Sequence, residues 1–143
     1  MDEIAMTNLV LNILGWSVGG LVALFVARIA YQFITPFDAR KELVEDRNMA
    51  VGISHGMFII AAAILLHGII VGERMQVAWW YEALFMGGLY LAGLALLWLG
   101  RVALRFLSHF DLDAEIHEKD NPAVGVLEGC SYVGFAIIIH SAL

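Results

Sequence analysis

Residues 48–72 read NMAVGISHGMFIIAAAILLHGIIVG, a stretch that contains no Lys, Arg, Asp or Glu. Asparagine, here Asn48, is a residue type that favours helix starts. The only ionisable side chains in the stretch are those of His55 and His67. About 20 mostly apolar residues are enough for a helix to cross the hydrocarbon core of a bilayer. The stretch therefore predicts a transmembrane helix, and the rest of the chain can be compared with it.

Three further stretches have the same character. Of the 143 residues, 61% are hydrophobic and only 15% are charged, whereas about a quarter of the residues in a soluble domain are charged. Backbone groups in lipid must be hydrogen-bonded within the segment, so such stretches are expected to be helical. The sequence predicts an all-α membrane protein with four transmembrane helices, at about residues 7–31, 48–72, 77–100 and 121–143.

Composition also excludes several functions. The net charge of −6 argues against nucleic-acid binding, which requires a basic surface. The single cysteine, Cys130, excludes an internal disulfide and a cysteine-based zinc site. No nucleophile–base arrangement or glycine-rich phosphate loop is present, so we do not expect an enzyme. The N-terminus lacks the positive region of a cleaved signal peptide, so we expect the first span to be retained.

The chain repeats itself at a distance of 73 residues. Over residues 37–70, 12 of 34 positions are identical to those of residues 110–143 without a gap, and Arg28 matches Arg101 in the same register. Two tandem repeats, 1–72 and 73–143, are therefore predicted, each consisting of a helix, a loop and a helix. Since each repeat has two spans, both insert the same way up, related by a pseudo-two-fold axis along the membrane normal.

The basic residues predict the orientation. Seven of the eight lie in or beside the two long loops, and one, Arg74, lies in the short loop between the repeats. By the positive-inside rule the long loops are cytoplasmic and both termini are outside. Arg28 and Arg101 are expected to extend to the headgroups of the cytoplasmic leaflet.

The loop that links the first two spans carries a recognisable pattern. Ile34-Thr35-Pro36-Phe37-Asp38 is followed by acids, and Asn48-x-Ala50 then opens an apolar helix. This pattern resembles the DUF350 family, also called UPF0719, over nearly the whole chain. The resemblance implies a small bacterial inner-membrane protein with four spans in two repeats, and it implies no biochemical activity. Typical members have small residues where this chain has His67 and His140.

The polar residues of the two long loops have two interpretations. Thr35 to Asp38 is interpreted as a helix-capping box, repeated at Ser108 to Asp111, while Asn48 and Asn121 are predicted to cap the spans that follow. The loop acids then belong to solvated interfacial helices. Alternatively they form a cytoplasmic carboxylate collar that attracts cations or docks a basic partner. These acids are Asp38, Glu42, Glu45, Asp111, Glu115 and Glu118.

Small residues share one face of the second span, and their repeat partners share one face of the fourth. Glycines spaced four apart allow helices to approach closely in lipid. We therefore expect the second and fourth helices to meet on this face, either within one chain or across an oligomer interface. The residues are Gly52, Gly56 and Ala63 with their counterparts Gly125, Gly129 and Ala136.

Four ionisable residues lie within these two spans. His67 and His140 are expected at equal depth toward the outer leaflet. His55 and Glu128 occupy matching positions about 18 Å nearer the cytoplasm, where they could form a histidine–carboxylate pair. Ionisable groups inside a membrane are costly and are usually paired or functional.

Four interpretations remain open for these four residues. They could serve only in packing, in which case the protein is a structural or accessory subunit of a homo-oligomer or larger membrane complex. The two outer histidines could ligate a b-type haem for electron transfer. All four could form a proton or cation relay. A metal site is the last alternative, although two ligands per chain are too few for closed zinc coordination unless a dimer supplies four.

Overall fold

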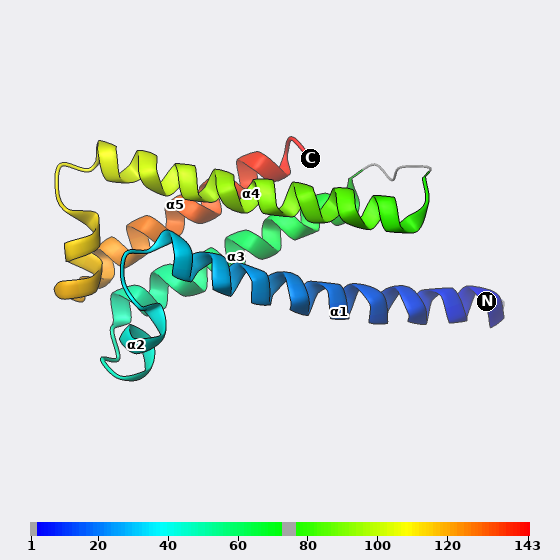
Figure 1. Cartoon of the computed structure of the whole chain (residues 1–143), viewed down its shortest axis with the longest axis horizontal. Coiled ribbons are helices and arrows are strands. Elements are labelled where there is room, and N and C mark those ends of the chain that lie inside the picture. Colours follow the sequence, from blue (N-terminus) through cyan, green and yellow to red (C-terminus); the bar gives the residue numbers. More distant parts are fainter. Residues whose placement is uncertain (1–2, 73–76) are drawn as a thin grey trace.

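The computed structural model describes residues 3–72 and 77–143 of the chain. All regular structure in these two ranges is helical (Figure 1). The elements are α1 (Glu3–Ile34), α2 (Ala39–Val44), α3 (Met49–Val71), α4 (Trp79–Leu107), the short π-helical turn η1 (Ala114–Glu118) and α5 (Pro122–His140).

Four of these helices, α1, α3, α4 and α5, are long and apolar enough to cross a membrane. The predicted number of spans is confirmed, but α4 does not end at Gly100. It continues to Leu107, and Ser108 ends it, with its hydroxyl donating to the carbonyl of Leu104 at 2.8 Å. Arg101 therefore lies inside a spanning helix rather than in the loop.

The centre of the bundle is the pair α3 and α5, which contact each other along most of their length, with α1 packed on α3 and α4 on both (Figure 1). Gly125 and Gly129 make the close approach possible. A Cβ atom at Gly125 would lie 2.5 Å from the carbonyl oxygen of Ala50, and one at Gly129 would overlap Met57. The second and fourth spans thus pair within one chain.

The matching small residues of α3 do not share this role. A Cβ at Gly56 would meet no atom within 4 Å, and one at Gly52 would make only ordinary contact with Leu43. Ala63 is exposed while Ala136 is fully buried. The reason is that α3 packs against α1, α4 and α5 at once, so it turns larger side chains toward α5 and its small face outward.

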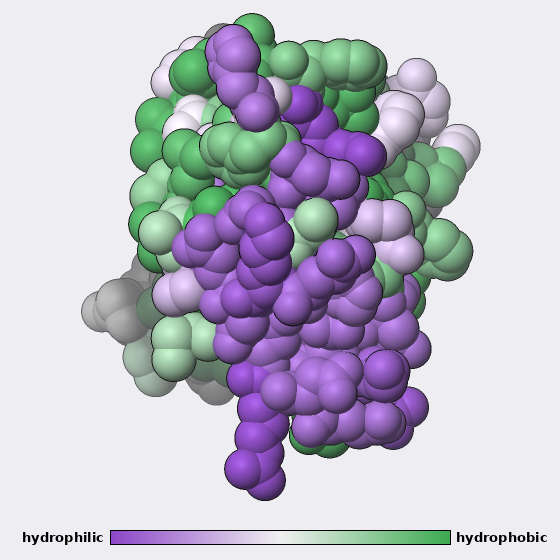
Figure 2. Space-filling model, turned by 90° about the vertical axis from the view of Figure 1, so that its left-hand side faces the viewer, coloured by the Kyte–Doolittle hydropathy of each residue, from purple (hydrophilic) through white to green (hydrophobic). Residues whose placement is uncertain are grey.

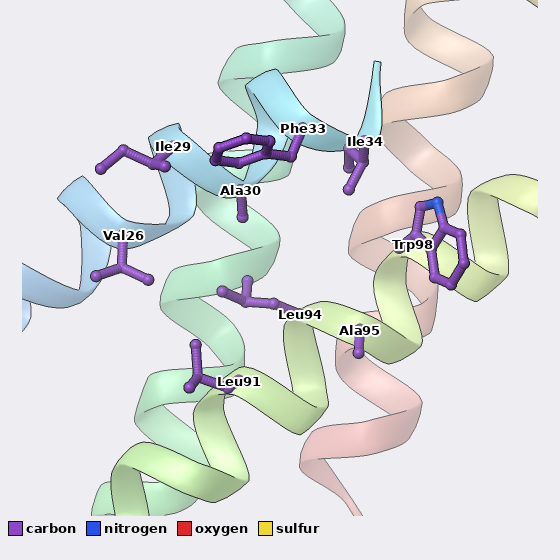
Figure 3. A pocket seen from close by; sticks show the side chains of 9 residues that line it. All are labelled: Val26, Ile29, Ala30, Phe33, Ile34, Leu91, Leu94, Ala95 and Trp98. Carbon is purple, nitrogen blue, oxygen red and sulfur yellow. The ribbon is translucent and has the colours of Figure 1, made fainter. Parts of the chain in front are cut away.

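The two long helices at the edge, α1 and α4, leave an open space between them. The half of α1 nearer the N-terminus extends beyond the bundle (Figure 1), and every residue from Met6 to Gly15 is exposed. Closer to the loops, side chains of the two helices line an apolar groove, and among its lining residues only Trp98 has a polar side-chain atom (Figure 3). This side of α1 has little protein to pack against.

The two loops gather at one end of the bundle, called the loop end below, which presents a hydrophilic surface (Figure 2). Asp38 begins α2 by accepting hydrogen bonds from the backbone of Arg40 and Lys41 at 2.9 and 3.2 Å. Asp111 does the same for the next loop, from Asp113 and Ala114 at 3.1 and 3.2 Å.

The predicted capping by Thr35 is wrong. Its hydroxyl donates backwards to the carbonyl of Tyr31 at 2.9 Å, as the hydroxyl of Ser108 does at the end of α4. A side chain that closes the preceding helix in this way is not free to cap the next one, so Asp38 and Asp111 do so. The predicted caps Asn48 and Asn121 are confirmed, accepting from the backbone nitrogens of Val51 and Ala123.

Candidate functional site

A buried ion pair joins α4 to α5 near the loop end. Nε of Arg101 donates to Oε1 of Glu128 at 2.8 Å, and the two residues are only 3% and 0% exposed. Both lie inside spanning helices, six residues from the helix end nearest the loops. A rise of 1.5 Å per residue places them about 9 Å from those ends.

The guanidinium of Arg101 also holds the neighbouring elements. Its Nη1 donates to the carbonyl of Ile34 at the end of α1, at 3.3 Å. Its Nη2 pairs with Asp113, just before η1, and the second oxygen of Asp113 lies 3.0 Å from Nη2 of Arg105. Two arginines thus meet two carboxylates, and one side chain connects α1, α4, α5 and the second loop.

A chain of hydroxyl groups completes the coordination of Glu128. The hydroxyl of Ser54 on α3 donates to its second carboxylate oxygen, and the hydroxyl of Tyr31 on α1 donates to Ser54 at 3.0 Å. Tyr31 and Ser54 are both fully buried. Because both carboxylate oxygens are hydrogen-bonded, the protein itself balances the cost of burying the charge.

Two buried polar atoms beside this cluster have no hydrogen bond of good geometry among the described residues: Nε2 of His55 and the hydroxyl of Tyr132, of which the second lies next to the guanidinium of Arg101. The ring of Tyr132 meets Phe58 edge-on, and the imidazole of His55 stacks on Tyr31 with the ring centres 4.4 Å apart. Buried polar atoms without partners are uncommon in native proteins. The region next to the ion cluster therefore has unused hydrogen-bonding capacity.

Glu128 and His55 do not pair in the way their matching positions suggest. Arg101 and Ser54 occupy the carboxylate of Glu128, while His55 stacks on Tyr31 instead. Sequence reasoning missed Arg101 because it assigned that residue to the loop. The available signal was that a lone acid in a spanning helix requires a cation at the same depth.

His67 and His140 lie side by side toward the end of the bundle opposite the loops. Nδ1 of His67 is 3.0 Å from Nε2 of His140, and the rings stack with centres 5.3 Å apart. Gly68 makes room, since a Cβ there would lie 3.0 Å from Cδ2 of His140. In residues 3–72 and 77–143 no group of three or more metal-binding side chains is found.

The loop acids mostly serve the loops themselves. Glu42 is 4% exposed, and its two oxygens contact Nδ2 of Asn48 at 3.0 Å and Nδ1 of His117 at 2.8 Å. Asn48 also donates to the carbonyl of Ile116 at 2.9 Å, which joins the first loop to the second. Glu42 and Asn48 therefore belong to the contact between the loops.

Glu115 has the corresponding contacts in the second loop but lies nearer the surface. It pairs with Lys119 at 2.6 Å and accepts from Asn121 at 2.8 Å, and these hydrogen bonds lower the pKa of Glu115. The same ion pair raises the pKa of Lys119. Glu45 and Glu118 are exposed, so only part of the predicted collar faces solvent.

Four apolar helices, a polar loop end and a satisfied ion cluster define a helical membrane-spanning protein with a buried electrostatic contact near one membrane surface. The chain belongs to the DUF350 family, described as a domain of unknown function, whose pattern matches residues 5–143. No curated protein and no solved structure matches the chain.

Proposed function

We propose that this protein is a non-enzymatic structural or accessory subunit of a membrane assembly built at least in part from copies of itself. The observation that carries the proposal is the state of α1. The most apolar 18-residue stretch of this helix contains no buried residue. In the corresponding stretches of α3, α4 and α5, 28–39% of the residues are buried. The N-terminal half of this span has almost no packing against its own chain, since every residue from Met6 to Gly15 is exposed, and it is expected to pack against another chain.

The ion cluster supports a structural role. Arg101 and Glu128 have all their strong contacts within the chain, including those to Ser54 and Asp113. A polar network that is already satisfied fixes the positions of helices more readily than it binds a substrate. In this proposal the cluster holds the four helices together at the loop end, while the N-terminal half of α1 remains available to a neighbour.

The wider arrangement belongs to the same proposal. We place the protein in the bacterial inner membrane with both termini outside, as two tandem repeats. The repeat is supported by loop conformations 73 residues apart. Arg47 and Asp120 both have a positive φ, of 55° and 45°, and the backbone nitrogens of Asn48 and Asn121 both donate to a glutamate carbonyl at 2.9 Å.

The test is the oligomeric state in a bilayer. The protein is reconstituted into nanodiscs at several protein-to-lipid ratios, and its mass is measured. In parallel, Leu14→Cys, at an exposed position of α1, is oxidised with copper phenanthroline, which enters the bilayer and forms disulfides between spanning helices, in a Cys130→Ser background. We expect crosslinked dimers or larger species. A monomer at every ratio, with no crosslink, contradicts the proposal.

The second candidate function is a conduit for protons, cations or electrons. It is favoured by the hydrogen-bonded series Tyr31, Ser54 and Glu128 and by the contact between His67 and His140. Between these two places the described core consists of apolar side chains such as Phe58 and Leu65. A relay across the membrane would therefore need water or a second copy to bridge that part.

The electron-transfer form of this candidate requires a rearrangement. Axial ligation places the iron and the macrocycle between the two imidazoles, but here the rings of His67 and His140 are in direct hydrogen-bond contact. An oxidised and a reduced absorption spectrum of the purified protein tests haem. Proton flux in liposomes, compared with that of Glu128→Gln, tests the relay, and flux equal to that of empty vesicles excludes it.

A further inference from the structure

A groove opens to the surface between α1 and α3, close to the loop end. Its polar residues are Arg28 and His55, and Gly52 and Gly56 form its α3 side. The remaining lining is apolar, from Leu24, Phe25 and Ile59 among others. The groove thus has basic side chains at one end and apolar side chains along the rest of its length.

Arg28 has no carboxylate partner in the part of the chain that the structure describes. It is exposed, and among the described residues it forms no ion pair. Its counterpart 73 residues later, Arg101, is buried and paired with both Glu128 and Asp113. The two arginines occupy the same position in the sequence repeat but have opposite electrostatic surroundings.

The sequence explains the difference. The position that corresponds to Glu128 is His55, and the one that corresponds to Asp113 is Arg40. The first half of the chain therefore lacks both acids that neutralise Arg101 in the second half. His55 contributes a ring whose Nε2 is buried and has no hydrogen-bond partner within residues 3–72 and 77–143. This end of the groove is consequently short of negative charge and of hydrogen-bond partners.

The same comparison applies to the glycines. The space beside Gly125 is occupied by Ala50, and the space beside Gly129 by Met57, both from the neighbouring helix α3. Gly56 has no atom within 4 Å of a Cβ position, and the groove runs along it. A surface that is closed by protein in the second half is open in the first.

The depth of the groove matches a lipid. Residues 6–27 of α1 carry no charge, and at 1.5 Å per residue they span about 33 Å, close to the ~30 Å hydrocarbon core. Arg28 then lies at the level of the phosphate groups. Leu24 and Phe25 lie one turn farther from the loop end, where an acyl chain would run.

We propose that this groove binds an anionic phospholipid, with the phosphate at Arg28 and an acyl chain along Gly52 and Gly56. The phosphate supplies the counter-charge that Glu128 and Asp113 supply to Arg101. Basic pockets between helices at a membrane surface recognise lipid headgroups in this way. The apolar course of the groove and its opening toward the bilayer favour a lipid over a soluble anion.

The test is native mass spectrometry of the full chain in detergent, titrated with dioleoyl-phosphatidylglycerol or dioleoyl-phosphatidylcholine. We expect the wild-type protein to retain the anionic lipid about five-fold more than the zwitterionic one, the effect of one basic residue near a lipid surface. Arg28→Gln should remove this preference, and Arg28→Lys should keep most of it. Arg40→Gln, which lies outside the groove, is the matched charge control and should keep it as well.

Gly56→Leu tests the acyl part of the site. The side chain would enter open space, so the fold should be retained, while lipid retention should fall about as far as in Arg28→Gln. Gly15→Leu, also in open space, is its control.

Four outcomes would overturn the proposal. The first is equal retention of the two lipids, and the second is an Arg28→Gln variant that behaves as Arg40→Gln does. The third is full competition by inorganic phosphate, which would indicate a site for a soluble anion. If Gly56→Leu lowers the oligomer mass and leaves lipid retention unchanged, the occupant is a second copy and not a lipid.

Discussion

Nε of Arg101 and Oε1 of Glu128 lie 2.8 Å apart in a place where neither residue is more than 3% exposed. The pair connects two spanning helices, and the other contacts of both residues extend the connection to α1, α3 and the second loop. Removing one charge of such a pair leaves the other buried and uncompensated, which is more costly than removing both.

Glu128→Ala should therefore be strongly destabilising. We expect the free energy of unfolding to fall by about 3–5 kcal/mol, since Arg101 keeps only Asp113 as a counter-ion. The double variant Arg101→Leu/Glu128→Leu should recover most of the loss. Chemical unfolding in detergent provides the measurement, with the exposed Glu118→Ala as a control expected to change stability by no more than about 0.5 kcal/mol. A single variant as stable as the double variant would contradict this account.

The sequence predicts the spans well and the site only in part, for a physical reason. Hydropathy identifies a segment that must be in lipid, and 73-residue periodicity aligns two such segments. Neither reveals which side of α4 approaches α5. Glu128 could be recognised as a costly residue inside a span. Identifying Arg101 as its partner required knowing that α4 continues past Gly100, and an arginine at the end of an apolar stretch is usually assigned to the headgroup region.

The packing of the small residues shows the same limit. The repeat makes Gly52 and Gly125 equivalent in sequence, and a helical wheel puts both on one face. Only the three-dimensional arrangement separates them, because α3 contacts three helices and α5 mainly contacts α3 and α4. A pattern that repeats in the sequence therefore need not repeat in its environment.

Gly125→Ala and Gly52→Ala form a pair that tests this difference. The methyl group at Gly125 would lie 2.5 Å from a backbone oxygen that cannot move aside, whereas the one at Gly52 would make an ordinary contact at 3.6 Å. We expect Gly125→Ala to lower the free energy of unfolding by about 1–3 kcal/mol, and Gly52→Ala to be close to neutral. Equal effects in thermal unfolding would show that α3 and α5 do not pack as described.

Asn48→Ala should be more damaging than Asn121→Ala. Both remove a helix cap, which is worth about 0.5–2 kcal/mol. Each asparagine also donates to a loop glutamate, Asn48 to Glu42 and Asn121 to Glu115. Asn48 alone also donates to the carbonyl of Ile116 in the other loop, and it is only 6% exposed. We expect the Asn48 variant to lose about 1–3 kcal/mol more, the cost of leaving buried partners unsatisfied. Thermal unfolding of the two variants side by side decides the comparison.

The ion pair between Glu115 and Lys119 predicts a pH dependence outside the membrane. The hydrogen bond from Lys119, followed by that from Asn121, lowers the pKa of Glu115 below 4.5 in the folded protein. A lowered pKa contributes stability that is present above the unfolded value and is lost as the pH falls through the folded value. In Lys119→Met, carbon-detected NMR should show the pKa of Glu115 moving up toward 4.5. A titration curve unchanged by the substitution would mean that the pair does not form in solution.

The contact between His67 and His140 separates a packing role from a relay or ligand role. If the two imidazoles only bond each other, His67→Ala, His140→Ala and the double variant should give a coupling energy of about 0.6 kcal/mol, typical of polar contacts between membrane helices. Neither variant should then change an absorption spectrum or proton flux. The contact lies between parts of α3 and α5 that are otherwise apolar, so its loss should not disturb the distant Arg101–Glu128 pair. A coupling energy near zero, together with lost flux or a lost absorption band in both single variants, would instead indicate that the two histidines act on something other than each other.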